Sequence, residues 1–378
     1  MLFESVLYFG ADFRFHTGDV GTEGSRIAAV RPRDCAPRAM LLPGLVDIHL
    51  HGNSGADFSD GSAEEFGRMA RFLAAHGTTS FSAATLTLPE EQLAAACRAA
   101  AAFHAAQPEG AAALRGITLE GPFFSMGKRG AQNPDYLRLP DAAMFARLQR
   151  EAEGLIRIAC VAPELPGAIP FIRSVVSGGV TVSVAHTEAE YDAASAAFEA
   201  GATHVTHLYN AMPPLLHRTP GVIGAASERE NVTAELIADG IHVHPSAVRA
   251  AFRLFPGRIC LVSDALSACG MPDGEYLLGG QKIRVAGPRA TLADGTLAGS
   301  VATLFDCLRN AVRFGIPAEE AVRAASCTPA RVIGADGETG AIRAGLAADL
   351  LLCSLNWELQ KVYVGGRPVA DASCVTGA

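Results

Sequence analysis

Two histidines separated by one residue stand at the end of the first strongly apolar run of this sequence, in the segment LVDIHLHG (residues 45–52). Residues two apart on a β-strand point to the same side, so His49 and His51 could bind one metal ion together. The alternative is a pair of buried histidines that are satisfied by hydrogen bonds. A second His-x-His pair, His242 and His244, shows that the spacing alone is weak evidence for a metal site. The residues at the ends of the other apolar runs therefore decide between a metal site and a hydrogen-bonded pair.

Further metal-binding residue types follow three later apolar runs. Glu120, His186 and His207 would add one carboxylate and two imidazoles, a mixed oxygen and nitrogen set that suits Zn²⁺ or Fe²⁺. His204 stands three residues before His207 and competes with it as a ligand. An odd separation on a strand places side chains on opposite faces, so we expect His204 to point toward the surrounding helices and to be structural. Together these residues predict a site for a divalent metal ion.

Asp264 follows the apolar run ICLV (259–262) and is the candidate general acid and base. Beside a divalent ion, a carboxylate in this position can take a proton from water and later deliver it to a leaving amine. This assignment predicts the hydrolysis of an amide bond. A cap or a turn is the alternative role for an aspartate that directly follows a strand.

Bringing these residues together requires a particular fold. Between residues 43 and 264, short runs with β propensity alternate with alanine-rich helical stretches, the order expected of a parallel sheet with helical crossovers. The repeats predict a closed (β/α)8 barrel, in which the carboxyl ends of the strands face the active site. An open doubly wound sheet is the alternative, although no Gly-rich dinucleotide motif follows the first run. The predicted strands span 45–50, 78–83, 114–119, 156–161, 180–185, 203–206, 232–238 and 258–263, and the helices among them include 62–75, 90–106, 141–151, 166–177 and 188–200.

The two ends of the chain flank this pattern with further β-like runs. We expect residues 1–42 and 345–378 to pair as a small β-sandwich domain, because neither end alone has enough strands to be stable. Residues 43–344 then form the barrel domain. Within it, the Gly-rich stretch 275–297 predicts a β-hairpin excursion that is followed by a helix over 301–313.

Composition limits the partners and the compartment. The formal net charge is −8 and no run of Lys or Arg occurs, so we expect neither a nucleic-acid partner nor binding to an anionic membrane. The sequence has no cationic segment before an apolar stretch at its start, and no window reaches the ~18 apolar residues of a membrane span, which predicts a cytoplasmic protein. The 9 cysteines form no Cys-x-x-Cys pair, so we expect reduced core thiols rather than disulfides or a thiolate metal site.

A series of short segments, in a fixed order, carries a resemblance that covers nearly the whole chain. The sequence resembles the amidohydrolase superfamily and, within it, the N-acetylglucosamine-6-phosphate deacetylase family. Such an ordered series is far more specific than any single motif. The segments are PGLVDIHLHG (43–52), GTTSF (77–81), LEGPFF (119–124), AHT (185–187), THLYNAMPP (206–214), ELIADGIH (235–242), LVSDA (261–265), LAGS (297–300) and GAIRAGLAADLLL (340–352).

The resemblance implies a chemical activity and the residues that perform it. A divalent metal, Zn or Fe, would support removal of the acetyl group from N-acetylglucosamine 6-phosphate, with Asp264 as the catalytic acid and base. Family members that keep the His-x-His pair resemble two-metal enzymes, so a second ion bridged to the first by Glu120 is implied. The implied metal ligands are Glu120, His186 and His207 for the principal ion, with His49 and His51 for the second.

Contacts to the sugar phosphate are also implied by the resemblance. An arginine fork such as that of Arg218 is well matched to a phosphate, although an arginine on a loop is ordinarily just solvated. Homologues of this kind resemble dimers, so a homodimer is implied, and a phosphate contact from the neighbouring subunit with it. The implied substrate-binding residues are Ala131, Gln132, Asn210, Ala211, Arg218, His242, Leu297, Ala298 and Gly299.

One position departs from the family pattern. A Gly-Ala-His sequence usually follows LEGPFF, and its histidine contacts the substrate near the scissile amide, but this chain has Gly130-Ala131-Gln132. Glutamine can donate a neutral hydrogen bond to a carbonyl but cannot become a cation. Three alternatives therefore stay open: the same deacetylation of N-acetylgalactosamine 6-phosphate or another acyl amino sugar, a different amidohydrolase reaction, and a metal-binding or sugar-phosphate-sensing protein without activity.

Overall fold

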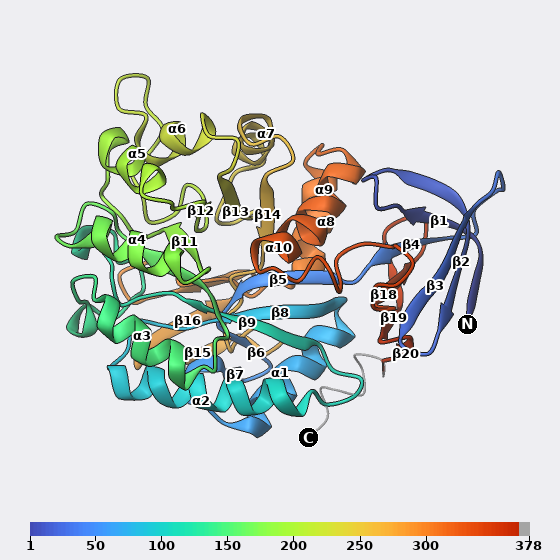
Figure 1. Ribbon diagram of the computed structural model, residues 1–378, viewed down its shortest axis with the longest axis horizontal. Helices are drawn as coiled ribbons and strands as arrows, with labels where there is room; N and C mark the ends of the chain where they lie inside the picture. Colours follow the sequence, from blue (N-terminus) through green and yellow to red (C-terminus); the bar gives the residue numbers. More distant parts are fainter. Residues whose placement is uncertain (370–378) are drawn as a thin grey trace.

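A computed structural model describes residues 1–369 and contains an eight-stranded parallel sheet at its centre (Figure 1). The strand order is β14-β13-β12-β11-β10-β9-β8-β5, so neighbours in the sequence are neighbours in the sheet. This is the order predicted for a (β/α)8 barrel, and that prediction is confirmed. The strands are β5 (Leu45–Leu50), β8 (Thr78–Ala84), β9 (Ala113–Leu119), β10 (Ile156–Val161), β11 (Thr181–Val184), β12 (His204–Val205), β13 (Thr233–Ile237) and β14 (Ile259–Val262).

The first and last strands of the barrel, β5 and β14, are joined at their carboxyl ends. The backbone N–H of Asp264 donates a hydrogen bond to the carbonyl oxygen of His49 (2.9 Å). Next to it, Ser263 Oγ donates to Oδ2 of the fully buried Asp47 (2.5 Å). Burial raises the pKa of Asp47 to about 7, against the opposing effect of the hydrogen bond from Ser263. These contacts close the sheet on itself.

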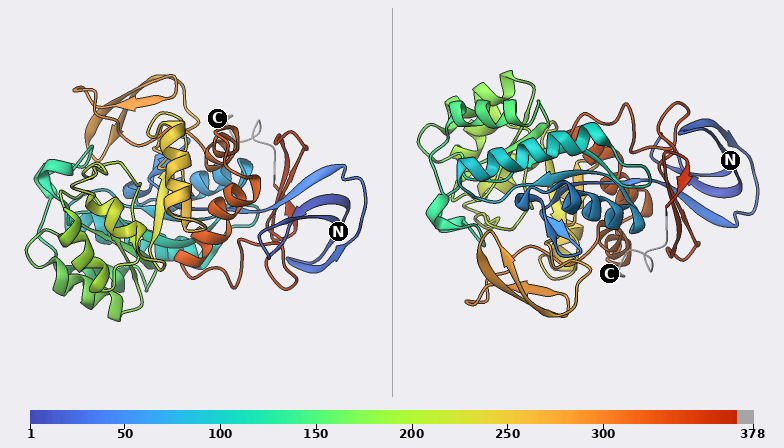
Figure 2. Two further views of the ribbon diagram at one scale, coloured as in Figure 1. Left: turned by 90° about the horizontal axis from the view of Figure 1, so that it is seen from above. Right: turned by 90° about the horizontal axis from the view of Figure 1, so that it is seen from below.

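Helices cover the outside of the barrel (Figures 1 and 2), and four of the ten α-helices in the described residues have a side-chain cap at the first turn. Ser62 accepts a hydrogen bond from Glu65 N at the start of one helix, and Thr303 and Asp306 form a reciprocal capping box at the start of another. No helix within residues 1–369 is long and apolar enough to cross a membrane. The helices are α1 (Ala63–Ala75), α2 (Glu90–Ala106), α3 (Ala142–Glu151), α4 (Ala168–Ser177), α5 (Tyr191–Glu199), α6 (Gly221–Ser227), α7 (Pro245–Leu254), α8 (Leu304–Arg313), α9 (Ala318–Ala325) and α10 (Cys327–Val332).

Apolar side chains fill the barrel from the end opposite the carboxyl ends of its strands. A cluster of buried residues from several strands packs there against Ala330 and Ile333, at the end of α10. These residues alternate along the strands with those of a larger cluster that lies under the helices. The strand residues of the inner cluster include Val46, Ile48, Ile158, Cys160, Ile237, Cys260 and Val262. The eight cysteines of the described part are free thiols, seven of them buried, and Cys374 lies outside it.

The two ends of the chain pair in one sheet of seven strands beside the barrel, in the order β20-β19-β18-β4-β1-β2-β3. The rings of Phe3 and Tyr363, from strands far apart in this order, lie 5.1 Å from each other, so the sheet curls around its own core. Figure 2 shows the blue amino-terminal strands and the red strands β18 to β20 side by side at one end of the molecule. The division at residues 42 and 345 stays a prediction, and 370–378 lie outside the described residues. The strands are β1 (Leu2–Phe9), β2 (Phe15–Glu23), β3 (Arg26–Pro32), β4 (Ala39–Pro43), β18 (Leu350–Cys353), β19 (Leu359–Val364) and β20 (Arg367–Pro368).

The predicted excursion after the eighth barrel strand is a three-stranded antiparallel sheet. In Figure 2 it projects from one side of the barrel in orange. Gln281 Nε2 donates to the carbonyl oxygen of Ala131 (2.6 Å), which ties this sheet to the loop after β9. The strands are β15 (Gly274–Leu278), β16 (Gln281–Ala286) and β17 (Arg289–Thr291), and a further short hairpin consists of β6 (Gly52–Asn53) and β7 (Ala56–Asp57).

Candidate functional site

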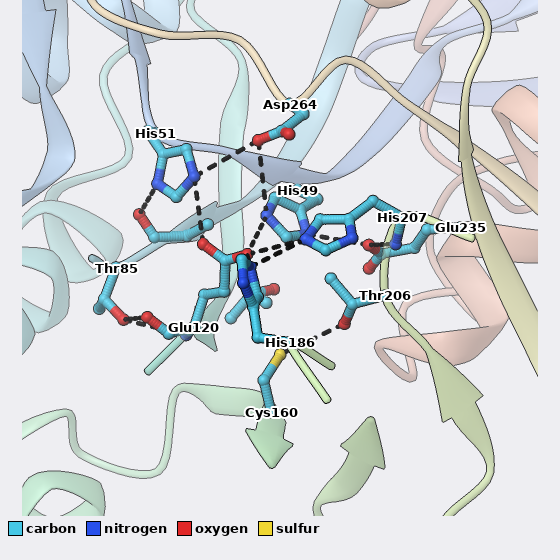
Figure 3. A network of polar contacts seen from close by, with 12 residues as sticks. His49, His51, Thr85, Glu120, Cys160, His186, Thr206, His207, Glu235 and Asp264 are labelled. Carbon is cyan, nitrogen blue, oxygen red and sulfur yellow. Dashed lines mark hydrogen bonds and ion pairs between the residues drawn. The ribbon is translucent and has the colours of Figure 1, made fainter. Parts of the chain in front are cut away.

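Six side chains converge at the carboxyl ends of the barrel strands (Figure 3). All of them are buried, and their ligand atoms form two adjacent groups that could each hold a metal ion. The structure thus brings together every residue that was predicted to bind metal, with Asp264 beside them. The first group is Glu120, His186 and His207, and the second is His49, His51 and Asp264.

The carboxylate of Glu120 lies between the two groups. Its Oε1 is 3.1 Å from His186 Nε2 and 3.3 Å from His207 Nε2. Its Oε2 is 3.2 Å from His51 Nε2, and that nitrogen is also 3.4 Å from Asp264 Oδ1. Oε1 also lies 3.4 Å from His49 Nε2, so Oε1 faces both groups, Oε2 faces the second, and Glu120 is shared by the two.

Hydrogen bonds on the far side of the imidazole rings orient them toward the centre. His186 Nδ1 lies 2.9 Å from the carbonyl oxygen of Lys128, and His51 Nδ1 lies 3.3 Å from that of Ala84. A carbonyl only accepts, so each Nδ1 carries a proton and each Nε2 is the atom that can present a lone pair to a metal once it carries no proton itself. The Nε2 atoms of His186 and His207 face each other at 3.1 Å, a contact that a cation between them would relieve.

The charges and unpaired atoms of the site fit a divalent cation. Nε2 of the fully buried His49 has no hydrogen-bond partner among residues 1–369, although it points to the cluster. Burial alone would lower the pKa of His51, but Asp264 and Glu120 overcome this effect and raise it to about 10 in the metal-free protein. In the metal-free protein the proton on His51 thus neutralises part of the negative charge of Asp264 and Glu120, as a bound cation would. Buried nitrogen and oxygen ligands of this kind suit Zn²⁺ or Fe²⁺.

Three of the six residues have a left-handed backbone. The φ angles are +45° at His186, +27° at His207 and +50° at Asp264. Such a conformation costs on the order of 1–3 kcal/mol for a residue other than glycine and is kept where the surrounding structure enforces it. Each residue leaves the extended path directly after its strand, and this change of direction brings its side chain over the barrel mouth.

The prediction that His204 points toward the helices is wrong. His204 Nε2 lies 3.0 Å from Glu235 Oε1, and Glu235 Oε2 lies 2.9 Å from His49 Nδ1, so His204 shares a face with the metal ligands. The odd-spacing argument failed because His207 lies beyond β12 with a left-handed φ, where strand alternation no longer applies.

Glu235 is a functional residue that the sequence reasoning missed. Burial alone would raise its pKa, but the charge of His49 and the hydrogen bond from His204 hold it far below its usual range. The carboxylate therefore fixes the His49 ring from behind, as outer-shell carboxylates do for metal-binding histidines. A glutamate inside the otherwise apolar run 232–238 was the signal that could have revealed it.

A cavity of about 560 Å³ opens above the six side chains. Two residues predicted to bind the substrate are not part of its wall: Ala298 is fully buried behind it, and Arg218 is exposed and hydrogen-bonded to His217. Lys128 and Arg129, which were not predicted, supply the wall with positive charge. The predicted substrate-binding residues that line the cavity are Ala131, Gln132, Asn210, Ala211, His242, Leu297 and Gly299.

His242 is paired with a carboxylate on the wall of this cavity. Its Nδ1 lies 2.7 Å from Asp239 Oδ2. Burial alone would lower the pKa of His242, but the hydrogen bond to Asp239 more than offsets this effect, and the pKa is raised from its ordinary value. The ring can therefore carry a positive charge that faces an anionic ligand.

Comparison with known proteins places these features among enzymes. The amidohydrolase family model matches residues 40–369. The chain is 39% identical over 357 residues to N-acetylglucosamine-6-phosphate deacetylase of Bacillus subtilis (strain 168), with 90% of each chain covered. It is 35% identical over 329 residues to N-acetylgalactosamine-6-phosphate deacetylase of Escherichia coli O157:H7, with 87% of each covered. A mutant of N-acetyl-D-glucosamine-6-phosphate deacetylase from Mycobacterium smegmatis, in complex with N-acetyl-D-glucosamine-6-phosphate, has a similar structure, with a TM-score of 0.91, 35% identity and coverage of 98% of this chain and 99% of that one.

Proposed function

Because this chain belongs to the amidohydrolase family and to its N-acetylglucosamine-6-phosphate deacetylases, we propose that it hydrolyses the acetamide of N-acetylglucosamine 6-phosphate to acetate and the amino sugar phosphate. The observation that supports this most directly is the two groups of buried potential metal ligands at the floor of one cavity. A barrel that only senses a sugar phosphate has no need of such a pair.

The proposed metal ligands are the six convergent residues. An ion bound there, Zn²⁺ or Fe²⁺, lowers the pKa of a water molecule and polarises a carbonyl group. Glu120 would hold the ions together through its two oxygens. The principal ion is assigned to Glu120, His186 and His207, and a second ion to His49, His51 and Asp264.

Asp264 is the proposed proton carrier. Burial alone would raise its pKa, but the hydrogen bond to His51 and the charge of His49 keep the pKa below its ordinary value. It is therefore a carboxylate at neutral pH, the form that accepts a proton from the attacking water. The same side chain then delivers that proton to the nitrogen of the leaving amine, which completes the exchange without any further acid.

The phosphate is assigned to the cationic residues of the cavity wall, which are His242, Lys128 and Arg129. Asn210 stands nearby, with its amide nitrogen donating to His207 O (3.2 Å). In the proposed homodimer, Arg218 of one copy would reach the phosphate held by the other, which agrees with its exposed position outside its own cavity.

Acetate release from three compounds tests the proposed substrate. With metal-loaded enzyme, we expect N-acetylglucosamine 6-phosphate to be the best substrate, its galacto epimer to be slower, and unphosphorylated N-acetylglucosamine to lose at least about 100-fold in kcat/KM, because charged hydrogen bonds contribute ~1.5–3 kcal/mol each. Preference for the galacto epimer would favour the activity named for the Escherichia coli relative. Silence on all three with metal bound would refute the proposed substrate class.

Binding of the phosphate group is expected to depend on pH through His242. The raised pKa keeps the ring charged below that pKa, and the charge is lost as the pH rises through it. We therefore expect the inhibition constant of glucose 6-phosphate, which lacks the acetamide, to increase with pH across this transition. His242→Asn should weaken binding by about 10- to 100-fold and remove the transition. An unchanged pH profile in His242→Asn would show that another group binds the phosphate.

A further inference from the structure

Gln132, the residue that departs from the family pattern, is engaged on both sides of its amide. It is 5% exposed. Its Nε2 donates to Glu120 Oε2 (2.8 Å), and its Oε1 accepts a hydrogen bond from the backbone N–H of Thr87 (2.7 Å). One residue thus links the carboxylate between the two metal groups to the backbone of the loop after β8.

The two partners leave the amide a single orientation. An ionised carboxylate only accepts and a backbone N–H only donates, so rotating the amide by 180° would break both hydrogen bonds. Only one N–H of Gln132 is left for a ligand. The Gln132 amide therefore forms most of its hydrogen bonds within the protein. The resemblance to the family had instead implied that this residue contacts the substrate.

The segment that carries Gln132 is itself held in place. Gln132 N donates to Arg129 O (3.0 Å), and Gln281 of β16 holds the carbonyl of Ala131 from the other side. The side chain of Gln132 is therefore anchored before it reaches Glu120, which allows it to resist rotation of that carboxylate.

Rotation of Glu120 matters because its two oxygens have different tasks. Oε1 faces His186 and His207 and lies 3.4 Å from His49 Nε2, while Oε2 faces His51 and is the oxygen that Gln132 holds. Without this hydrogen bond, the carboxylate could turn Oε2 away from His51. The second group would then keep His49, His51 and Asp264 but lose the oxygen that belongs to it alone.

We propose that Gln132 is a positioning residue that keeps Glu120 spread across both groups and thereby secures the second metal ion. This inference rests on the proposed function only in requiring a metal centre, and it does not depend on the identity of the sugar. Because an amide has no proton to gain or lose in the physiological range, the link persists whatever the pH.

Metal titration of Gln132→Met tests the proposal. Methionine has nearly the same length but cannot form either hydrogen bond. In titrations of the metal-free protein with Co²⁺, followed by absorption and by chelator competition, we expect the first ion to bind as in the wild type and the second about 10- to 100-fold more weakly. Gln132→Asn, which stays polar but is one methylene too short to reach both partners, should show the same loss. The matched control is Gln92→Met, the same substitution at an exposed position of α2, and it should bind both ions normally.

Kinetics with saturating metal separate positioning from substrate contact. A positioning role lowers kcat at unchanged KM when the second site is empty, and excess metal restores kcat. Two ions of wild-type affinity in Gln132→Met together with a raised KM would overturn the proposal and restore the substrate contact. A wild-type chain that binds a single ion would overturn it too, whereas two ions without acetate release would contradict only the proposed function.

Discussion

Replacing Asp264 with asparagine is expected to lower kcat for acetate release by about 100- to 10,000-fold, the range attributed to a positioned acid or base. Asparagine fills the same volume, but its amide cannot take a proton from water or return one to the amine. The loss should appear in kcat rather than KM, because Asp264 lies at the cavity floor with the metal groups and is not among the residues proposed to bind the phosphate.

The measurement needs a metal analysis on the same sample, because Asp264 also belongs to the second metal group. If Asp264→Asn loses turnover while an ion is still bound at the first group, the loss comes either from missing proton transfer or from a missing second ion. Adding excess metal distinguishes these, since only a deficit of bound ion is restored. Asp239→Asn is a matched control for kcat: it alters a carboxylate that contacts His242 and no predicted metal ligand, so its effect should fall on KM. Full turnover in Asp264→Asn would refute the assignment.

Removing the metal is expected to abolish turnover and to lower the melting temperature. An ion that binds only the folded chain stabilises it by ~2.7–4.1 kcal/mol at concentrations 100- to 1,000-fold above Kd, which corresponds to roughly 5 °C for a chain of this length. Dialysis against a chelator followed by thermal unfolding measures this effect, and adding Zn²⁺ or Fe²⁺ should reverse it. Glu120→Gln removes the carboxylate between the two groups, so its melting temperature should respond to metal far less.

The same experiment has a defined pH dependence. In the metal-free protein the pKa of His51 is raised to about 10, so this histidine is protonated at neutral pH and must lose its proton to bind an ion. Metal affinity, and with it the gain in melting temperature, should therefore increase as the pH rises toward that pKa and decrease as the pH falls. A metal-dependent gain that is the same at pH 6 and pH 8 would show that His51 is not a ligand.

The barrel was predictable because its strands are short apolar runs at regular spacing and because polar residues mark where they end. β5 and β10 have the predicted bounds, and the other barrel strands differ by one or two residues at their ends. The convergence of the six side chains follows from the same logic, since the carboxyl ends of parallel strands meet at one end of the barrel.

What could not be predicted depends on backbone conformation at single residues and on partners distant in the sequence. The left-handed φ of His207 reverses the face expected for His204, and no local pattern announces it. Gln132 finds its partners at Thr87 and Glu120, which are separated from it by 45 and 12 residues. The support of Glu235 for His49 spans 186 residues. Such pairs are decided by how the barrel closes rather than by spacing along the chain.

The pairing of β4 with β18 determines the order in which the two sheets can form during translation. Met40 lies opposite Cys353 in this pair, so the sheet beside the barrel cannot be completed until residue 353 has left the ribosome. All eight barrel strands are available once residue 262 has emerged. The 91 residues between these points take on the order of 5–20 s to translate, and for that time β1 to β4 wait with an open edge. The strands that position the six converging side chains are therefore synthesised before β4 can gain β18 as a partner.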